Sequence, residues 1–367
     1  MKVTTRSYNT ARTGANVEEA ALTPHILARN FMVKHVSLHV DDDPRIEAQP
    51  LYVPGIKMGD GKVHDVVYVA TMANNIWAFD ANDGKAIWKA PTHLGRPVKP
   101  KPTPHPGFPS ASEIDIWGVN ILWGILGTPV IDAATNKLYA VAWTSPDGST
   151  AQAVYQLHEV DITDGKALRS TEIQASAAGQ DSHGRPVAQF IPSRQKQRPA
   201  LLLVDTGGLP PRKTIFVAFG NGVGKVTFVA KSAEVASAGM GGLGGMPGGF
   251  VVVSSNGSQP NSGIIWATAP ISGDANRHVV EGILRAYDPT ALDPHSNADG
   301  TPRLKLLWDS KHIPNNTFQF SKFCPPVVAD GKVIVATYEG NVDIYISANP
   351  PAGPKPTNAQ RIPRRRG

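Results

Sequence analysis

The stretch NNIWAFDANDGKAIWKA, residues 74–90, carries the pattern that most constrains the fold of this chain. An alternating apolar segment ends at Asp80, the chain turns at Asp83-Gly84, and a second short segment ends in a tryptophan. Aspartate favours such turns because its carboxylate accepts hydrogen bonds from nearby backbone amides, and glycine tolerates the positive φ they require. The pattern predicts two antiparallel strands joined by a tight turn.

Further copies of this pattern occur along the chain. In residues 127–173, Asp161 and the turn Asp164-Gly165-Lys166 stand at the spacing of Asp80 and Asp83-Gly84-Lys85. A half copy, a whole copy and a copy without its outer strand occupy residues 198–220, 248–310 and 325–347, respectively. Repetition on this scale is typical of proteins built from stacked supersecondary units.

Each full copy is interpreted as four short antiparallel strands, a sheet that cannot bury both faces alone. Stacking such sheets around an axis buries them, and this radial arrangement is the β-propeller. We therefore predict an all-β propeller of about five four-stranded blades, with the third blade incomplete. The N-terminal segment 31–40 is a spare strand that would complete the last blade.

The positions of the repeats also predict the domain boundaries. Residues 1–30 form an N-terminal extension, residues 31–347 a single propeller domain, and residues 348–367 a disordered tail rich in proline and arginine. The composition agrees with short strands and many turns, because Gly 35 and Pro 32 both exceed their average usage.

The repeat YVATMANNIWAFDANDGKAIW resembles that of pyrroloquinoline-quinone (PQQ)-type propellers. More narrowly, WGILGTPVIDAATNKLYAV, SSNGSQPNSGIIWAT and KFCPPVVADGKVIVATYEGNVDIY resemble a group of bacterial PQQ-like propeller proteins, largely without assigned activity. Relatives in that group carry more blades between stretches like TIFVAFG and SAEVAS. The resemblance thus implies a propeller that is internally shortened here, and it implies no particular reaction.

The resemblance leaves the cofactor open. Alcohol-oxidising quinoproteins of this superfamily hold PQQ between a tryptophan and a disulfide of adjacent cysteines, with Ca²⁺ nearby. This chain has one cysteine, Cys324, so it cannot form that disulfide. Other quinoproteins manage without this disulfide, so PQQ with Ca²⁺ remains the cofactor that the resemblance implies. The missing disulfide counts against it.

A propeller places the beginnings of its inner strands around the axial channel. The candidates for lining this channel are Gln49, Thr128, Arg198 and Lys322, and Trp117 and Trp123 could form a stacking wall beside them. Arg198 is the strongest candidate for ligand binding because a guanidinium can donate two hydrogen bonds to one carboxylate. A salt bridge between blades is the simpler explanation of Arg198, and packing between blades is the simpler explanation of both tryptophans.

Three functions from different classes fit the sequence. We favour a non-catalytic propeller that binds a small molecule or a protein through its channel mouth and loops, because we find no catalytic constellation. A PQQ-dependent oxidoreductase would use Arg198, Thr128 and Trp123 around the quinone. A carbohydrate-binding or carbohydrate-active propeller is the third, because tryptophans and Asn/Asp-rich loops suit sugars.

The sequence argues against several other classes. Four arginines of the +6 net charge lie in the terminal RIPRRRG, and no basic patch with interleaved aromatics occurs elsewhere, so we expect no nucleic-acid partner. The histidines lack metal-ligand spacing, and we expect no metal site. No apolar run is long enough for a membrane span, and no leader is visible, so we expect a soluble chain. Its compartment stays open, although the resemblance implies a periplasmic or secreted protein if a leader was removed.

Overall fold

The fold is seen in a computed structural model. It describes residues 1–29, 32–43, 45–100, 120–174, 176–178, 187–190, 192–193, 197–207, 212–216, 250–257, 259–273, 275, 278–296 and 302–348. Their regular secondary structure is almost entirely β-strand. The exceptions in regular structure are a short helix, α1 (Pro24–Arg29), and a 3-10 turn, η1 (Ser310–His312). The predicted all-β class is therefore confirmed.

The first two blades have the predicted four antiparallel strands in consecutive order. Blade 1 contains β3 (Leu51–Lys57), β4 (Val63–Ala70), β5 (Asn75–Asp80) and β6 (Thr92–His93). Blade 2 contains β7 (Val130–Asp132), β8 (Lys137–Thr144), β9 (Val154–Asp161) and β10 (Ala167–Glu172). The aspartate that recurs in the sequence ends the third strand of each blade.

The turns after these aspartates have the expected chemistry in both blades. Asn82 N donates to Asp80 Oδ1, and Thr163 N donates to Asp161 Oδ1, each at 2.8 Å. The turn glycines, Gly84 and Gly165, have φ values of 76° and 78°. Two turns 81 positions apart thus fold alike because they share the same side-chain acceptor and the same glycine.

Blade 4 is a complete sheet with one extra strand. It contains β15 (Phe250–Ser254), β16 (Ile264–Pro270), β17 (Gly282–Leu292) and β18 (Leu304–Asp309), and β1 (Ala15–Asn16) adds to the edge of β15. The addition of β1 was not predicted from the sequence.

Blade 5 is closed by a strand from the beginning of the chain, as predicted. Its sheet contains β19 (Val327–Ala329), β20 (Lys332–Ala336), β21 (Asn341–Ser347) and then β2 (Met32–His39) as the outer strand. Asp343 on β21 accepts a 2.5 Å hydrogen bond from Ser37 and lies 2.7 Å from the ammonium of Lys34. These contacts fix the register of β2, and β2 covers an edge of β21 that would otherwise be unpaired.

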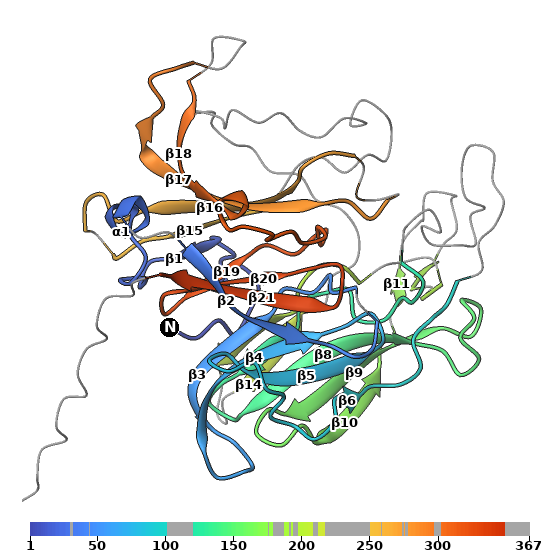
Figure 1. The fold of residues 1–367 in the computed structure, drawn as a ribbon. Coiled ribbons are helices and arrows are strands. Elements are labelled where there is room, and N and C mark those ends of the chain that lie inside the picture. The colour runs from blue at the N-terminus through green and yellow to red at the C-terminus, as the bar shows by residue number, and fades with distance from the viewer. Residues whose placement is uncertain are drawn as a thin grey trace, which may run out of the picture.

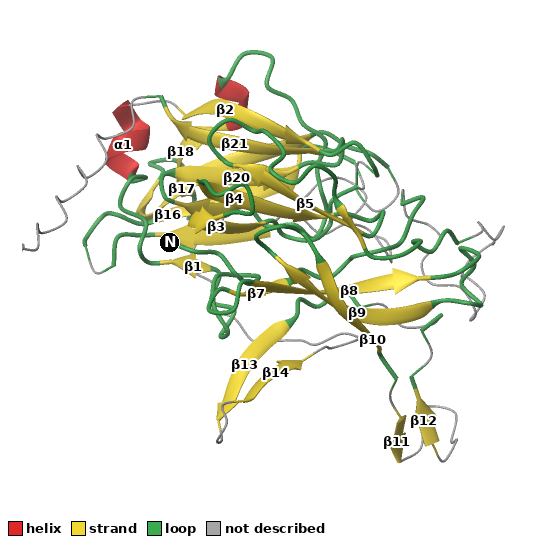
Figure 2. Ribbon diagram, turned by 90° about the horizontal axis from the view of Figure 1, so that it is seen from below, coloured by secondary structure: helices red, strands yellow, loops and turns green. Residues whose placement is uncertain are grey.

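The predicted incomplete third blade shows two strands among the described residues, β13 (Leu202–Gly207) and β14 (Arg212–Phe216). Residues 217–249, which follow β14, lie outside the described part of the chain, as do residues 349–367 of the predicted tail. A separate hairpin, β11 (Ser176–Ala178) and β12 (Val187–Gln189), extends away from the blades (Figure 2).

Three buried apolar clusters connect neighbouring blades. The first joins blades 4, 5 and 1 and includes Trp266, Ile344 and Val67; the second joins blades 1 and 2; the third joins blade 2 to β13 and β14. Figure 1 shows this stacking, with blade 4 in orange above blade 5 in red and blades 1 and 2 in blue and green below. The blades thus bury their faces against one another, as a propeller of such sheets requires.

Candidate functional site

The centre of the candidate site is Glu47, a carboxylate that the sequence analysis did not single out. Its side chain is 0% exposed. Glu47 Oε2 lies 2.5 Å from Arg198 Nη1, and Oε1 accepts a 2.8 Å hydrogen bond from Asn120 Nδ2 and lies 3.7 Å from Lys322 Nζ. Two of the predicted channel-lining residues, Arg198 and Lys322, therefore meet on one buried carboxylate.

These residues come from segments that lead into the inner strands. Glu47 precedes β3, Asn120 precedes β7, Arg198 precedes β13 and Lys322 precedes β19. The beginnings of inner strands face the axis, and this explains how residues separated by up to 275 positions come together. We call Glu47, Asn120, Arg198 and Lys322 the axial cluster. The salt bridge between blades that the sequence suggested for Arg198 is present.

Arg198 is held from a second side by Phe323. Its guanidinium carbon lies 3.8 Å from the centre of the Phe323 ring, a cation–π distance. Phe323 has a φ of 63°, which is rare for a bulky side chain and costs backbone energy. The surrounding contacts must therefore hold Phe323 in place beneath Arg198.

Lys322 is the least satisfied member of the axial cluster. Its side chain is 3% exposed, and the 3.7 Å separation from Glu47 is longer than a hydrogen bond. Among the described residues, no side chain or carbonyl accepts a hydrogen bond from its ammonium. A buried ammonium has three donors and a large desolvation cost, so this group calls for an acceptor.

The axial cluster carries more positive than negative charge. Burial by itself would raise the pKa of Glu47, but Arg198 and Lys322 together hold it below its ordinary value. Arg6 donates a 2.9 Å hydrogen bond to Phe323 O, and burial lowers its pKa, with a further contribution from the neighbouring charge of Arg198. Two cations therefore share the Glu47 carboxylate, and a third, Arg6, lies near Arg198.

Gln49 and Thr128 lie at a junction between blades. Gln49 N donates to Thr128 Oγ1 at 3.0 Å, and Thr128 O accepts from Leu201 N at 3.1 Å. Gln49 Oε1 in turn accepts a 3.2 Å hydrogen bond from Ser7 N. The described polar contacts of both residues connect blades 1, 2 and 3 and the N-terminal segment.

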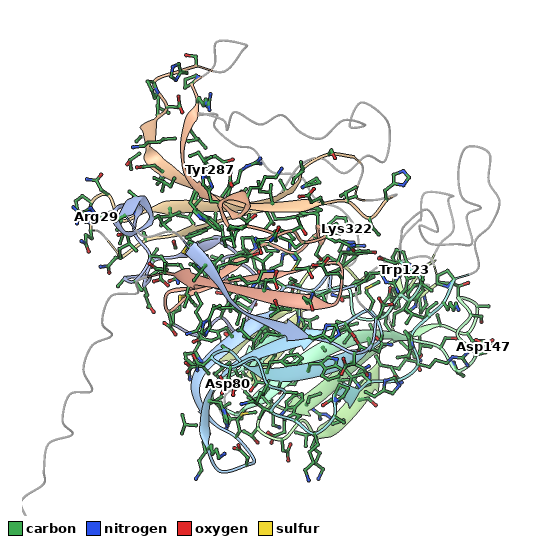
Figure 3. All side chains as sticks on the ribbon, viewed as in Figure 1. Arg29, Asp80, Trp123, Asp147, Tyr287 and Lys322 are labelled. Atoms are coloured by element: carbon green, nitrogen blue, oxygen red, sulfur yellow. The ribbon has the colours of Figure 1, made fainter. Side chains whose placement is uncertain are left out.

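Trp123 packs between blades, the simpler of the two interpretations that the sequence allowed, the other being a stacking wall for a ligand. It is buried in the cluster that joins blade 2 to β13 and β14, and its indole Nε1 donates to Asn120 O at 3.3 Å. Trp117 lies within residues 101–119, outside the described part of the chain. Figure 3 shows Trp123 and Lys322 toward one side of the blade stack, with Asp80 toward the other.

Two buried groups near the axial cluster, Cys324 and Tyr338, have raised pKa values. Cys324 donates to Ala48 O at 3.5 Å, and burial raises the pKa of its thiol to about 12. Tyr338 donates a hydrogen bond to Asn120 Oδ1, and burial, with the charge of Glu47, raises its pKa. Neither group is an activated nucleophile or base near neutral pH.

The axis also contains the segment predicted as an N-terminal extension. Val3 pairs with Tyr52 of β3, Thr4 O accepts from Ile131 N of β7 at 2.7 Å, and Tyr8 OH accepts from Val328 N of β19 at 2.8 Å. Arg12 donates to Leu201 O ahead of β13, and β1 pairs with β15. Residues 3–16 therefore contact all five blades.

The sequence did contain a signal for Glu47. In the segment RIEAQP, a glutamate between two apolar residues stands two positions before Gln49, where we expected the channel wall. An isolated acid at that place, facing basic residues at the equivalent places of other repeats, indicates a counter-ion. No comparable signal existed for the course of residues 3–16, because their contacts are mostly made by the backbone.

The fold and the site define a β-propeller of four-stranded blades with a charged axial cluster. No known protein family and no curated protein matches the chain. Solved structures that resemble it include BamB from Moraxella catarrhalis, with 11% identity and a TM-score of 0.24 over 86% of this chain and 99% of that one.

Two further similar structures are quinohemoprotein alcohol dehydrogenases. The enzyme from Comamonas testosteroni is 14% identical with a TM-score of 0.23, and ADHIIG from Pseudomonas putida HK5 is 12% identical with a TM-score of 0.26. Both matches cover 94% of this chain and 80% of the other. Because all of these TM-scores lie below 0.5, we base no argument on them.

The axial cluster does not fit PQQ with Ca²⁺ in the way that the resemblance implies. Glu47 is already engaged by two cations and an amide, and Trp123 is packed between blades. Within the described residues, no group of three or more His, Cys, Asp or Glu side chains is placed to hold a metal ion.

None of the described helices is long and apolar enough to cross a membrane.

Proposed function

We propose that this propeller is a non-catalytic binding protein that takes an anionic small molecule at the axial cluster. The observation that carries the proposal is Lys322, a buried ammonium with a 3.7 Å ion pair and no hydrogen-bond acceptor among the described residues. An anionic oxygen bound there would accept hydrogen bonds from Lys322 and offset the surplus positive charge of Arg198 and Arg6.

The described groups of the axial cluster support binding rather than catalysis. Asn120 is an amide, and the pKa of Glu47 is held low, so neither is suited to act as a general acid or base near pH 7. The carbohydrate alternative receives no support from Trp123, because a buried indole cannot stack on a sugar ring.

The proposal is tested by calorimetric titration of the folded protein with citrate, inorganic phosphate and PQQ, each with and without Ca²⁺. We expect saturable binding of at least one anion without a requirement for Ca²⁺. The variant Lys322→Met, which keeps the length of the side chain and removes its charge, should weaken this binding at least about tenfold. The matched control Lys311→Met changes an exposed lysine and should bind like the wild type.

Two outcomes would refute the proposal. One is the absence of binding by a protein whose circular dichroism shows a folded β-structure. The other is equal binding by the wild type and a folded Lys322→Met variant. Calcium-dependent binding of PQQ together with dye-linked oxidation of an alcohol would instead favour a quinoprotein oxidoreductase.

A further inference from the structure

The pairing of β1 with β15 differs from all other described strand pairs because it is parallel. Ala15 stands opposite Val253 and Asn16 opposite Ser254. Backbone hydrogen bonds extend the pairing on both sides: Val253 N donates to Gly14 O at 2.7 Å, and Gly257 N donates to Val17 O at 2.6 Å. An extended segment added to the edge strand of a sheet is the arrangement of peptide binding by β-strand addition.

Two buried side chains fix the register of this added segment. Asn16 Nδ2 donates to Val328 O of blade 5 at 2.8 Å, and its Oδ1 accepts from Glu18 N at 2.9 Å. The Glu19 carboxylate is buried and accepts from the backbone amides of Ala21, Leu22 and Gly331, at 2.8, 3.1 and 3.1 Å. Two of these partners, Val328 O and Gly331 N, belong to blade 5 and lie outside the segment.

The rest of the segment is held by backbone hydrogen bonds rather than by side-chain packing. Val17 is 56% exposed, and a Cβ placed on Gly14 meets no atom nearer than 3.9 Å. A regular strand of two residues is too short to be stable by itself. The edge of β15 does not depend on it, because β15 forms five antiparallel pairs with β16 on its other side. Release of β1 would therefore leave a formed, unpaired strand edge.

We propose that the inner edge of β15, with Val328 and Gly331 of blade 5, is a strand-addition site, and that residues 14–19 occupy it as an exchangeable intrachain ligand. The replacing ligand is the same segment, residues 14–19, of a second copy of this chain. The intrachain segment is favoured by its effective concentration, which is in the millimolar range for a short connection. The proposal is independent of anion binding at Lys322.

The test uses the full-length chain and a fluorescent synthetic peptide of residues 10–22, followed by fluorescence anisotropy. In the double variant Asn16→Ala/Glu19→Gln the intrachain segment loses its side-chain anchors. We expect this variant to bind the peptide at least about tenfold more tightly than the wild type, because its internal competitor is weaker. A peptide that carries the same two substitutions is the matched control and should not bind.

Failure of a folded double variant to bind the peptide better than the wild type would overturn the proposal. If the double variant does not fold, hydrogen exchange of the wild type decides. Exchange of the Val253, Ser255 and Gly257 amides at least about tenfold faster than that of amides between β16 and β17 would support an exchangeable segment. Equal protection of the two sets would show that residues 14–19 are a fixed part of blade 4.

Discussion

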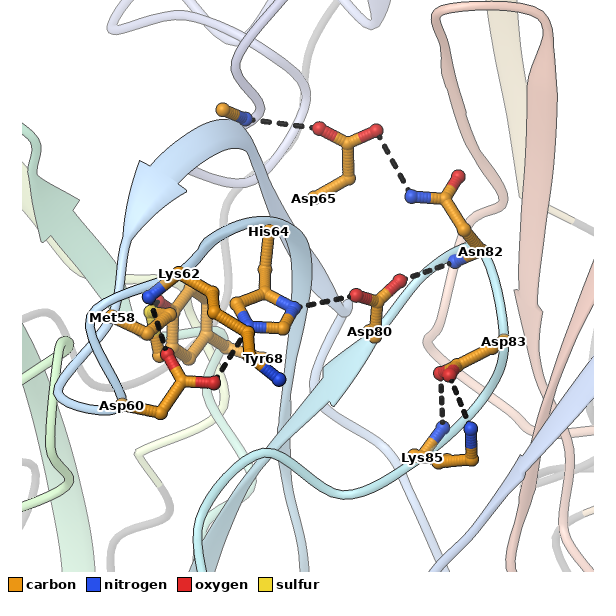
Figure 4. Close-up of polar contacts among 11 residues, drawn as sticks. Met58, Asp60, Lys62, His64, Asp65, Tyr68, Asp80, Asn82, Asp83 and Lys85 are labelled. Atoms are coloured by element: carbon orange, nitrogen blue, oxygen red, sulfur yellow. Dashed lines mark hydrogen bonds and ion pairs between the residues drawn. The ribbon is translucent and has the colours of Figure 1, made fainter.

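At the scale of single residues, the repeated turn aspartate also binds a histidine. Asp80 Oδ2 lies 2.7 Å from His64 Nδ1, while Asp60 Oδ2 lies 3.0 Å from His64 Nε2 (Figure 4). The hydrogen bonds to Asp80 and Asp60 raise the pKa of His64. The Lys62 backbone amide and His64 lower the pKa of Asp60. His64 therefore connects the β3–β4 turn to the end of β5 most strongly when it is protonated.

This arrangement predicts a pH-dependent stability. Because folding raises the pKa of His64, its stabilising effect is complete below the ordinary histidine value of about 6.5 and is lost as pH rises through the raised value. We expect His64→Gln to lower the Tm by about 2 °C near pH 5.5 and to have little effect above pH 8. The measurement is thermal unfolding from pH 5 to 9, with His278→Gln, an exposed histidine, as control. A difference that does not change with pH would contradict the prediction.

At the scale of elements, Trp88, which ends the repeat of blade 1, covers the Asp-Gly turn of blade 2 at Gly165. A Cβ on Gly165 would lie 2.8 Å from Cδ2 of the Trp88 ring, and Thr92 Oγ1 donates to Gly165 O. The glycine is therefore needed for two reasons, its positive φ and the close approach of the indole. The tryptophan of the repeat thus has an architectural role, joining blade 1 to blade 2.

Two glycine substitutions separate these two reasons. Gly61 has a φ of 83°, and a Cβ added to it would have no atom within 4 Å, so Gly61→Ala tests backbone conformation alone. We expect Gly61→Ala to lower the free energy of unfolding by about 1 kcal/mol. Gly165→Ala should lower it by about 2–4 kcal/mol, because the indole must also move. Urea denaturation of both variants measures the difference, and equal losses would show that Trp88 adjusts freely.

At the scale of the whole molecule, the axial cluster holds separate blades together. Glu47 precedes blade 1, and its partners precede blades 2, 3 and 5. Blades that meet at the axis bury their polar groups there, and a charge left without a partner in such a place is costly. The axial cluster thus links four blades through residues whose partners are distant in sequence.

Glu47→Gln is therefore expected to lower the free energy of unfolding by about 3–5 kcal/mol, because it leaves the buried Lys322 and the partly buried Arg198 without a counter-charge. Glu172→Gln, on the exposed edge strand β10, is the matched control and should change it by less than about 0.5 kcal/mol. Because the pKa of Glu47 is lowered on folding, its contribution is lost as pH falls through the folded value. Chemical denaturation at pH 7 measures both variants, and equal losses would contradict the interblade role.

Much of the architecture could be predicted because it follows from local patterns. The Asp-Gly turns, the alternating strands of blades 1 and 2 and the spare strand Met32–His39 all depend on residues near one another in sequence. The sequence named Arg198 and Lys322, which meet at Glu47, but it did not name Glu47 itself or the neighbouring Asn120. Pairing across blades leaves no periodic trace in one sequence.

The sequence by itself determined that the chain forms repeated four-stranded sheets, because turn chemistry and strand periodicity are properties of short segments. Only the tertiary structure decided which charges meet at the axis and where residues 3–19 run. Backbone hydrogen bonds hold most of that segment, and almost any residue can make them. Long-range electrostatic pairs depend in the same way on the stacking of whole blades, so they exist only once the blades have come together.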